Sequence, residues 1–145
     1  MSVHQCPCFT LGLAHRKVAR AFEEALAPLG LTIAQAHFLS CLYATDGQLP
    51  KDLARELGVD AGTLTPMIDR LERMGLVTRC PHPEDRRAIR LFLTEAAERI
   101  RPEVQARCDE VNERLMSKLS PEDYTRFLAL VRQLTEEAET VTTVR

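Results

Sequence analysis

The sequence has few aromatic residues, which make up 5% of the 145 residues, and it has no tryptophan. Alanine, leucine, glutamate and arginine dominate instead. Such a composition argues against a sheet-rich fold and favours a mainly helical protein with an aliphatic core. A chain of this length can bury roughly two thirds of its unfolded surface. We therefore expect a single domain that needs no disulfide or metal to hold it together.

The sequence also lacks a long hydrophobic run. Its beginning, MSVHQCPCF, carries neither a basic segment nor an apolar stretch of the kind found in secretory signals. No later segment approaches the roughly 18 apolar residues that a membrane span needs. The sequence therefore predicts a cytoplasmic protein with no membrane partner.

Motifs for catalysis are absent as well. The sequence contains no glycine-rich phosphate loop and no nucleophile elbow. Cys6 and Cys8 form a Cys-x-Cys pair, but no strand precedes the pair and no alternating strands and helices follow it, so the context of a thiol oxidoreductase is missing. We expect neither an enzyme nor a resident cofactor.

The hydrophobic periodicity predicts six helical segments and one hairpin. Apolar residues recur at helical spacing except in residues 76–93, where they alternate as in strands. The predicted helices cover residues 9–29, 33–43, 50–57, a segment after Asp60, 95–119 with an interruption or bend near Pro102, and a segment from 121. The predicted strands are residues 76–80 and 88–93, joined by the polar tip PHPEDRR. Helix, turn, helix and basic hairpin follow one another as in a winged helix-turn-helix.

The stretch DAGTLTPMIDRLERMG, residues 60–75, contains an unusual helix start. Its apolar residues have helical spacing, yet Gly62 and Pro66 disfavour a helix. This helix start would be explained if these residues enter a DNA groove. Gly62 would leave room for the DNA, and Thr63 and Thr65 would offer hydroxyls. Pro66 would stiffen the turn and leave a backbone carbonyl unpaired. In the alternative, Thr65 caps the helix, Pro66 begins it, and residues 60–64 form only a turn.

Positive charge is concentrated in one short region although the whole chain has a net charge of −2. Residues 70–90 contain six arginines and three carboxylates, while residues 91–145 contain 8 basic and 11 acidic residues. The planar guanidinium of arginine suits phosphates and guanine edges. This region is therefore a candidate nucleic-acid interface, and the alternative is an ordinary solvated face.

These residues resemble the MarR family of bacterial transcriptional regulators. The similarity runs from LAPLGLT through LARELGVDAGTLTPMIDRLERMGLVTR to DRRAIRLFLTE, and SPED fits the family's last helix. The run DAGTLTPMIDRLE resembles the branch that senses organic hydroperoxides. The resemblance implies an obligate homodimer that reads an inverted-repeat operator through two winged lobes. It implies one domain, residues 1–145, with a winged lobe at 32–94 and dimerisation helices at 9–31 and 95–140.

The resemblance also assigns roles to particular residues. Thr63, Thr65 and Arg70 match recognition-helix positions that meet the major groove, Arg87 matches the wing arginine that enters the minor groove, and Asp85 matches the acid that orients this arginine. A narrow minor groove attracts a long cation, and a nearby carboxylate can fix its rotamer. We expect phosphate contacts from Arg86 and Arg90. The full predicted set is Gly62, Thr63, Thr65, Pro66, Arg70, Arg73, Asp85, Arg86, Arg87 and Arg90. For Arg70 and Arg73 the alternative is surface pairing with Asp69 or Glu72.

The five cysteines give a weaker signal. An odd number of cysteines argues against a disulfide framework. Cys6 and Cys8 precede the first predicted helix, whose dipole would lower a thiol pKa, so a redox pair and inert thiols both stay open. Related sensors carry their reactive cysteine inside the first helix, where this chain has Ala14. His4, Cys6 and Cys8 match no zinc spacing, so no metal site is predicted.

Taken together, the residues and the resemblance predict a sequence-specific DNA-binding regulator. We expect a homodimeric repressor that releases its operator on binding a small aromatic or phenolic ligand, between the helical dimer region and the winged lobe, or on thiol oxidation. The alternative is a helical protein-interaction or dimerisation module without specific DNA binding. DNA affinity separates the two.

Overall fold

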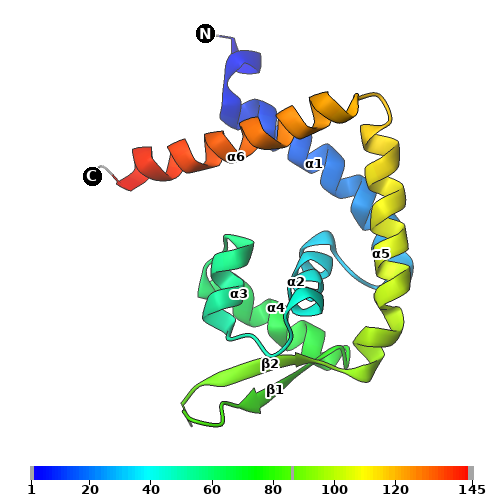
Figure 1. Ribbon diagram of the computed structural model, residues 1–145, viewed down its shortest axis with the longest axis vertical. Helices are drawn as coiled ribbons and strands as arrows, with labels where there is room; N and C mark the ends of the chain where they lie inside the picture. The colour runs from blue at the N-terminus through cyan, green and yellow to red at the C-terminus, as the bar shows by residue number, and fades with distance from the viewer. Residues whose placement is uncertain (1, 86, 144–145) are drawn as a thin grey trace. The chain divides into compact units, whose positions relative to one another are not determined.

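The computed structural model describes residues 2–85 and 87–143 of the chain (Figure 1). Two compact units are formed, residues 1–109 and residues 110–145. The elements in order are η1 Val3–Gln5, α1 Pro7–Leu26, η2 Ala27–Leu29, α2 Ile33–Ala44, α3 Pro50–Leu57, α4 Ala61–Arg73, β1 Val77–Pro81, β2 Ile89–Leu93, α5 Glu95–Met116 and α6 Pro121–Thr143. The expected mainly helical fold with a two-stranded hairpin is confirmed.

Local capping explains where several helices begin. The hydroxyl of Thr32 accepts a hydrogen bond from the Gln35 N–H at 3.2 Å, and the Gln35 side chain accepts one from the Thr32 N–H at 2.9 Å. This reciprocal pair satisfies two backbone donors that α2 leaves without helical partners. The hydroxyl of Ser120 accepts from the Asp123 N–H at 3.1 Å at the start of α6. Threonine and serine are among the residue types that most often cap helices.

Two predicted helix boundaries differ from the structure. Helix α1 begins at Pro7, so Cys8 lies inside the helix and does not precede it. Helix α5 runs as one helix from Glu95 to Met116 with Pro102 inside it, so it has no interruption and ends three residues before the predicted Leu119. Proline removes only its own N–H from the ladder, and Pro102 lies at an exposed position where water can satisfy the carbonyl one turn earlier.

The core of unit 1 lies where α2, α3, α4 and the hairpin meet (Figure 1). Its fully buried side chains are aliphatic except for one phenylalanine: Leu26, Phe38, Leu39, Leu42, Leu53, Leu64, Leu71, Val77 and Leu91. Leu64, Ile68 and Leu71 are the buried residues of α4, spaced three and four residues apart. This buried face fixes the rotation of α4 and directs its other face to solvent.

The hairpin is anchored at its base by residues 46–48. Strands β1 and β2 are antiparallel, with Val77 opposite Leu93, and Gln48 adds an isolated bridge to Leu91. Gly47 has a φ of +72°, and a Cβ there would lie 2.6 Å from the Phe92 ring. Because a larger residue would clash and be strained, glycine is required where this segment crosses β2.

Unit 2 contains the end of α5 and helix α6. Three apolar residues of α6 recur at helical spacing yet stay exposed: Phe127 at 47%, Leu130 at 55% and Leu134 at 40%. Among the described residues no single helix is long and apolar enough to cross a membrane, and only the bent pair 7–29 and 33–44 reaches that length and composition when taken together.

Candidate nucleic-acid interface

Helix α4 begins at Ala61 and takes Asp60 as its cap. The Asp60 carboxylate accepts a hydrogen bond from the Thr63 N–H at 2.8 Å, which satisfies one of the free donors of the first turn. Pro66 therefore lies inside the helix. The alternative interpretation, with Thr65 as the cap and residues 60–64 as a turn, is wrong because Leu64 is buried as part of the apolar face of α4.

The first two turns of α4 present a small, polar outer surface. Gly62, Thr63, Thr65 and Pro66 are all exposed. The Thr65 hydroxyl donates to the Ala61 carbonyl at 2.9 Å and keeps its lone pairs available as acceptors. Pro66 has no N–H to offer the Gly62 carbonyl, so that carbonyl loses its helical partner. A Cβ at Gly62 would lie 3.1 Å from the capping carboxylate of Asp60.

The two arginines of α4 point their charge to solvent. Arg70 and Arg73 are exposed, and neither forms an ion pair with any described residue. The sequence left open that they pair with Asp69 or Glu72. Both of those carboxylates instead bind Arg79 of β1. The guanidinium groups of Arg70 and Arg73 therefore remain available for an external anion.

Arg79 is turned toward α4 and is not part of the exposed basic surface. One nitrogen of its guanidinium, Nη2, donates to Asp69, and the other, Nη1, donates to Glu72. Its side chain is 28% exposed. The hydrogen bond with Asp69 is the main cause that raises the pKa of Arg79 above its ordinary value, against a smaller opposing effect of burial. This clamp joins the wing, defined as residues 77–93, to the α4 helix.

The wing tip is a tight turn held by its own backbone. The His82 N–H donates to the Ala88 carbonyl at 2.9 Å, and the Ala88 N–H donates to the Asp85 carbonyl at 3.0 Å. The Asp85 carboxylate accepts from the backbone N–H of Arg87 at 2.9 Å. The acid thus fixes the backbone that carries Arg87, whose side chain is exposed and unpaired among the described residues. Arg86 lies outside the described residues.

Arg90 is held against the base of the wing. Its Nε donates to the Gly47 carbonyl at 2.6 Å, and its guanidinium carbon lies 5.6 Å from the centre of the Phe92 ring. One face of this arginine therefore stabilises the junction between the wing and residues 46–48. The sequence prediction of a phosphate contact did not anticipate this structural contact.

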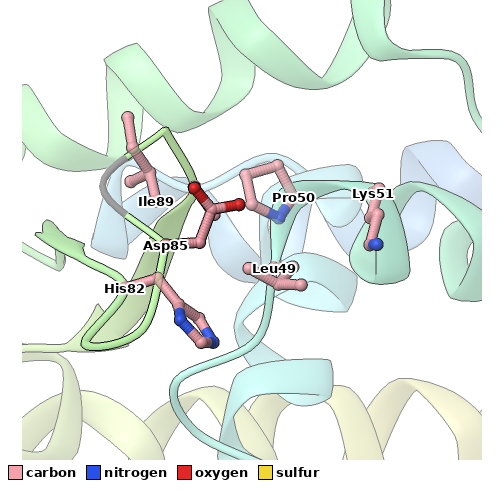
Figure 2. A pocket seen from close by; sticks show the side chains of 7 residues that line it. Leu49, Pro50, Lys51, His82, Asp85 and Ile89 are labelled. Atoms are coloured by element: carbon pink, nitrogen blue, oxygen red, sulfur yellow. The ribbon is translucent and has the colours of Figure 1, made fainter.

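A cavity of about 390 Å³ lies between the start of α3 and the wing. Figure 2 shows Leu49, Pro50 and Lys51 on one side and His82, Asp85 and Ile89 on the other. Four of its seven lining residues are apolar, and Lys51, His82 and Asp85 are the charged or polar ones. A cavity of this size and lining can take a small organic molecule.

The cysteines differ in their surroundings. Cys6 is the capping residue of α1 and Cys8 is exposed on its first turn. Burial, with the carboxylate of Glu56 nearby, raises the pKa of Cys41 to about 11. Cys41 therefore carries almost no thiolate at neutral pH and is a poor nucleophile. Within residues 2–85 and 87–143, no three His, Cys, Asp or Glu side chains are grouped to hold a metal.

Sequence reasoning missed the Arg79 clamp and counted Arg79 only as one of the six arginines in residues 70–90. A signal was available in the strand alternation, because Arg79 lies two residues after the buried Val77 and so faces the same side of β1. Its two acidic partners lie seven and ten residues earlier on another element, and no local pattern links them.

Known proteins similar to this chain are regulators of transcription. The MarR family model matches residues 31–89. The organic hydroperoxide resistance transcriptional regulator of Bacillus subtilis is 35% identical over 88 residues, which cover 61% of this chain and 60% of that protein. The transcriptional regulator SarZ of Staphylococcus haemolyticus is 31% identical over 106 residues, 73% of this chain and 72% of that protein.

The fold agrees with this similarity. A mutant of MarR from Escherichia coli, solved in complex with operator DNA, matches with a TM-score of 0.81 and 28% identity over 86% of this chain and 90% of that one. The matched family model contains α4 and most of the wing, the two elements whose exposed arginines are described above. The chain therefore belongs to the MarR family of transcriptional regulators.

Proposed function

We propose that this chain is a sequence-specific DNA-binding repressor that acts as a homodimer on an inverted-repeat operator in the cytoplasm. The observation that carries the proposal is the pair of unpaired arginines, Arg70 and Arg73, on the exposed side of α4. Arg73 has Asp69 one helical turn before it and does not pair with it, and Arg70 has no acidic residue three or four positions away. A surface of free guanidinium groups fits the phosphates of DNA.

In this proposal, the first two turns of α4 enter the major groove. The groove is about 12 Å wide and accepts a helix whose leading residues are small or polar. Gly62 and Pro66 keep the surface close to the backbone, while Thr63 and Thr65 offer hydroxyls to base edges. Arg70 and Arg73 follow one and two turns later, where the helix leaves the bases and passes the phosphates.

The wing supplies the second contact. Arg87 is exposed at a tip that four backbone and side-chain hydrogen bonds hold in shape. A preformed tip loses little conformational freedom when it binds, which favours insertion of Arg87 into the minor groove. Asp85 supports this by fixing the backbone at Arg87. Arg86 and Arg90 contribute phosphate contacts in this proposal.

Dimerisation uses the segments 9–31 and 95–140, outside the winged lobe at 32–94. The exposed apolar face of α6, formed by Phe127, Leu130 and Leu134, supports this assignment. A second copy of the chain would cover such a face and would place two α4 helices on one DNA duplex. Half-sites roughly 34 Å apart are read by a dimer of this kind.

Release of the operator follows from a small ligand or from oxidation of Cys6 and Cys8. The cavity beside the wing lies within the winged lobe and not between the lobe and the dimer helices, where the sequence predicts a small aromatic or phenolic ligand. An occupant of this cavity would contact the segment that carries Arg87. Exposure of Cys8 and partial exposure of Cys6 support thiol oxidation. The two routes are separated by treating wild type and a Cys6→Ser, Cys8→Ser double variant with peroxide. If both keep their affinity for operator DNA, or both lose it equally, these cysteines are not the switch.

The proposed function is tested by a gel-shift titration with the DNA upstream of the protein's own operon and an unrelated duplex of equal length. We expect a shift of the upstream duplex at concentrations at which the unrelated duplex stays free. A chain that is dimeric but binds neither duplex is instead an interaction module. The exposed apolar face of α6 is the observation that would favour that second function.

A further inference from the structure

The Asp69 carboxylate of α4 does not make the contact that its spacing favours. Asp69 and Arg73 lie four residues apart with the acid on the N-terminal side, which is the favourable arrangement for a helical ion pair. Pairs four residues apart form elsewhere in this chain at Arg20–Glu24, Glu95–Arg99, Glu103–Arg107 and Glu110–Arg114. Asp69 instead binds Arg79, ten residues away on the wing.

The position of Arg79 explains why Asp69 binds Arg79 and not Arg73. Arg79 lies on the face of β1 that carries the buried Val77, and its side chain is 28% exposed. Its guanidinium offers one nitrogen to Asp69 and another to Glu72. A planar group held at two points loses less freedom per hydrogen bond than two separate surface pairs would lose. Arg79 therefore outcompetes Arg73 for the Asp69 carboxylate.

We propose that Arg79 is a positioning residue for DNA binding, which holds the Asp69 carboxylate, with Glu72 as its second anchor, so that Arg73 stays unpaired for phosphates. This inference rests on the proposed function. Arg79 itself need not touch DNA. Without it, Asp69 would pair with Arg73, and both acids would be free to approach the phosphates that the arginines contact. A guanidinium that is already bound to a carboxylate releases fewer counterions when it meets a DNA phosphate. The salt dependence of binding measures how many counterions are released.

The experiment compares three variants of the full chain with wild type. Arg79→Met removes the charge but keeps a long side chain. A triple variant, Arg79→Met with Asp69→Asn and Glu72→Gln, removes the two acids as well. Arg99→Met is the matched control, because Arg99 pairs with Glu95 on the exposed surface of α5. Affinity for the upstream duplex and for the unrelated duplex is measured over a series of salt concentrations, with thermal unfolding as the check on folding.

We expect Arg79→Met to weaken binding to both duplexes and to lower the slope of log affinity against log salt by about one unit, although no phosphate contact was removed. The triple variant should recover the wild-type slope, and Arg99→Met should leave it unchanged. If Arg79 only stabilises the fold, the pattern is different. Arg79→Met and the triple variant would then unfold at similarly lowered temperatures, and both would keep the wild-type slope. That pattern, or a slope in the triple variant as low as in Arg79→Met, overturns the inference.

The unrelated duplex separates the inference from the proposed function. Phosphate contacts operate on any sequence, so the slope on this duplex tests Arg79 even if the upstream region contains no operator. Wild-type protein that binds both duplexes equally, with the slopes expected above, contradicts the sequence-specific function and supports the role of Arg79. If wild-type protein binds neither duplex, both the proposed function and the role of Arg79 are contradicted.

Discussion

Two regions of the chain leave different kinds of side chain without a partner. In unit 1, α4 and the wing bury their apolar residues and leave Arg70, Arg73 and Arg87 exposed and unpaired among the described residues. In unit 2, α6 leaves Phe127, Leu130 and Leu134 exposed. Unpaired cations fit a polyanion, and an exposed apolar face fits a second apolar face. In the proposed function, the first region accordingly binds DNA and the second binds another copy of the chain.

Helix α5 provides an internal standard for this comparison. Its arginines Arg99, Arg101 and Arg107 each form an ion pair with a glutamate three or four residues earlier. This is how a solvated helix surface normally arranges its charges, and such pairs contribute little to stability. Arg73 of α4 departs from that pattern, because Asp69 lies four residues earlier and binds Arg79 instead. This departure supports the proposed assignment of α4 as a DNA-binding surface.

The largest effect is expected for Leu130→Asp on the apolar face of α6. If this face is covered by a second copy, a carboxylate there would be buried without a partner and weaken the dimer by at least about 2 kcal/mol. Sedimentation at micromolar concentration should show a dimer for wild type and a monomer for the variant. Thr135→Asp adds the same charge to an exposed polar position of α6 and should stay dimeric. If Leu130→Asp forms a dimer as readily as wild type, the apolar face of α6 is not part of the dimer interface.

A smaller effect is expected for Arg87→Ala at the wing tip. Loss of a minor-groove arginine should weaken operator binding by roughly 1 to 3 kcal/mol, while folding stays intact because the side chain is exposed. The measurement is a titration at fixed salt, with Arg99→Ala as the control for loss of one surface cation. Unchanged affinity would contradict the wing contact.

A third prediction compares two residues at the start of α4, Asp60, which caps the helix, and Thr65, which is proposed to contact DNA bases. Asp60→Ala removes the carboxylate that accepts from the Thr63 N–H and should lower stability by about 1 kcal/mol. Thr65→Ala removes only a hydroxyl that donates to the Ala61 carbonyl, so stability should change by no more than about 0.5 kcal/mol.

Thr65→Ala should instead relax base preference, because a group that meets a base edge is lost. The measurement compares unfolding free energies with affinities for the operator and for single-base variants of it. Unchanged discrimination by Thr65→Ala would remove Thr65 from the base contacts.

Much of the fold was predictable because local rules and the hydrophobic pattern agree. Thr32, Pro50, Gly58 and Ser120 mark helix ends in the sequence and do so in the structure. The start of α4 was ambiguous, because Asp60 and Thr65 both satisfy the rules for a cap. Burial of Leu64 against the core decided between them, and burial is a tertiary property that a local rule does not contain.

The candidate site was predictable as a set of residue types and not as a set of contacts. The concentration of arginine in residues 70–90 indicated an anion-binding region. Arg79 belongs to the same cluster but is paired, because its two partners come from another element. The contact of Arg90 with Gly47 likewise joins two different elements, 43 residues apart in the sequence. Pairings across elements depend on how strand and helix pack, and one sequence does not specify them locally.

The most direct test of the central claim compares the salt dependence of DNA binding in two double variants. Arg70→Gln with Arg73→Gln removes two unpaired cations of α4, and Arg99→Gln with Arg114→Gln removes two cations that pair with glutamates on α5. Both variants lose the same charge. We expect the slope of log affinity against log salt to fall by about two units in the α4 variant and to stay at the wild-type value in the α5 variant. Equal slopes in the two variants would contradict the assignment of α4 as the DNA-binding surface.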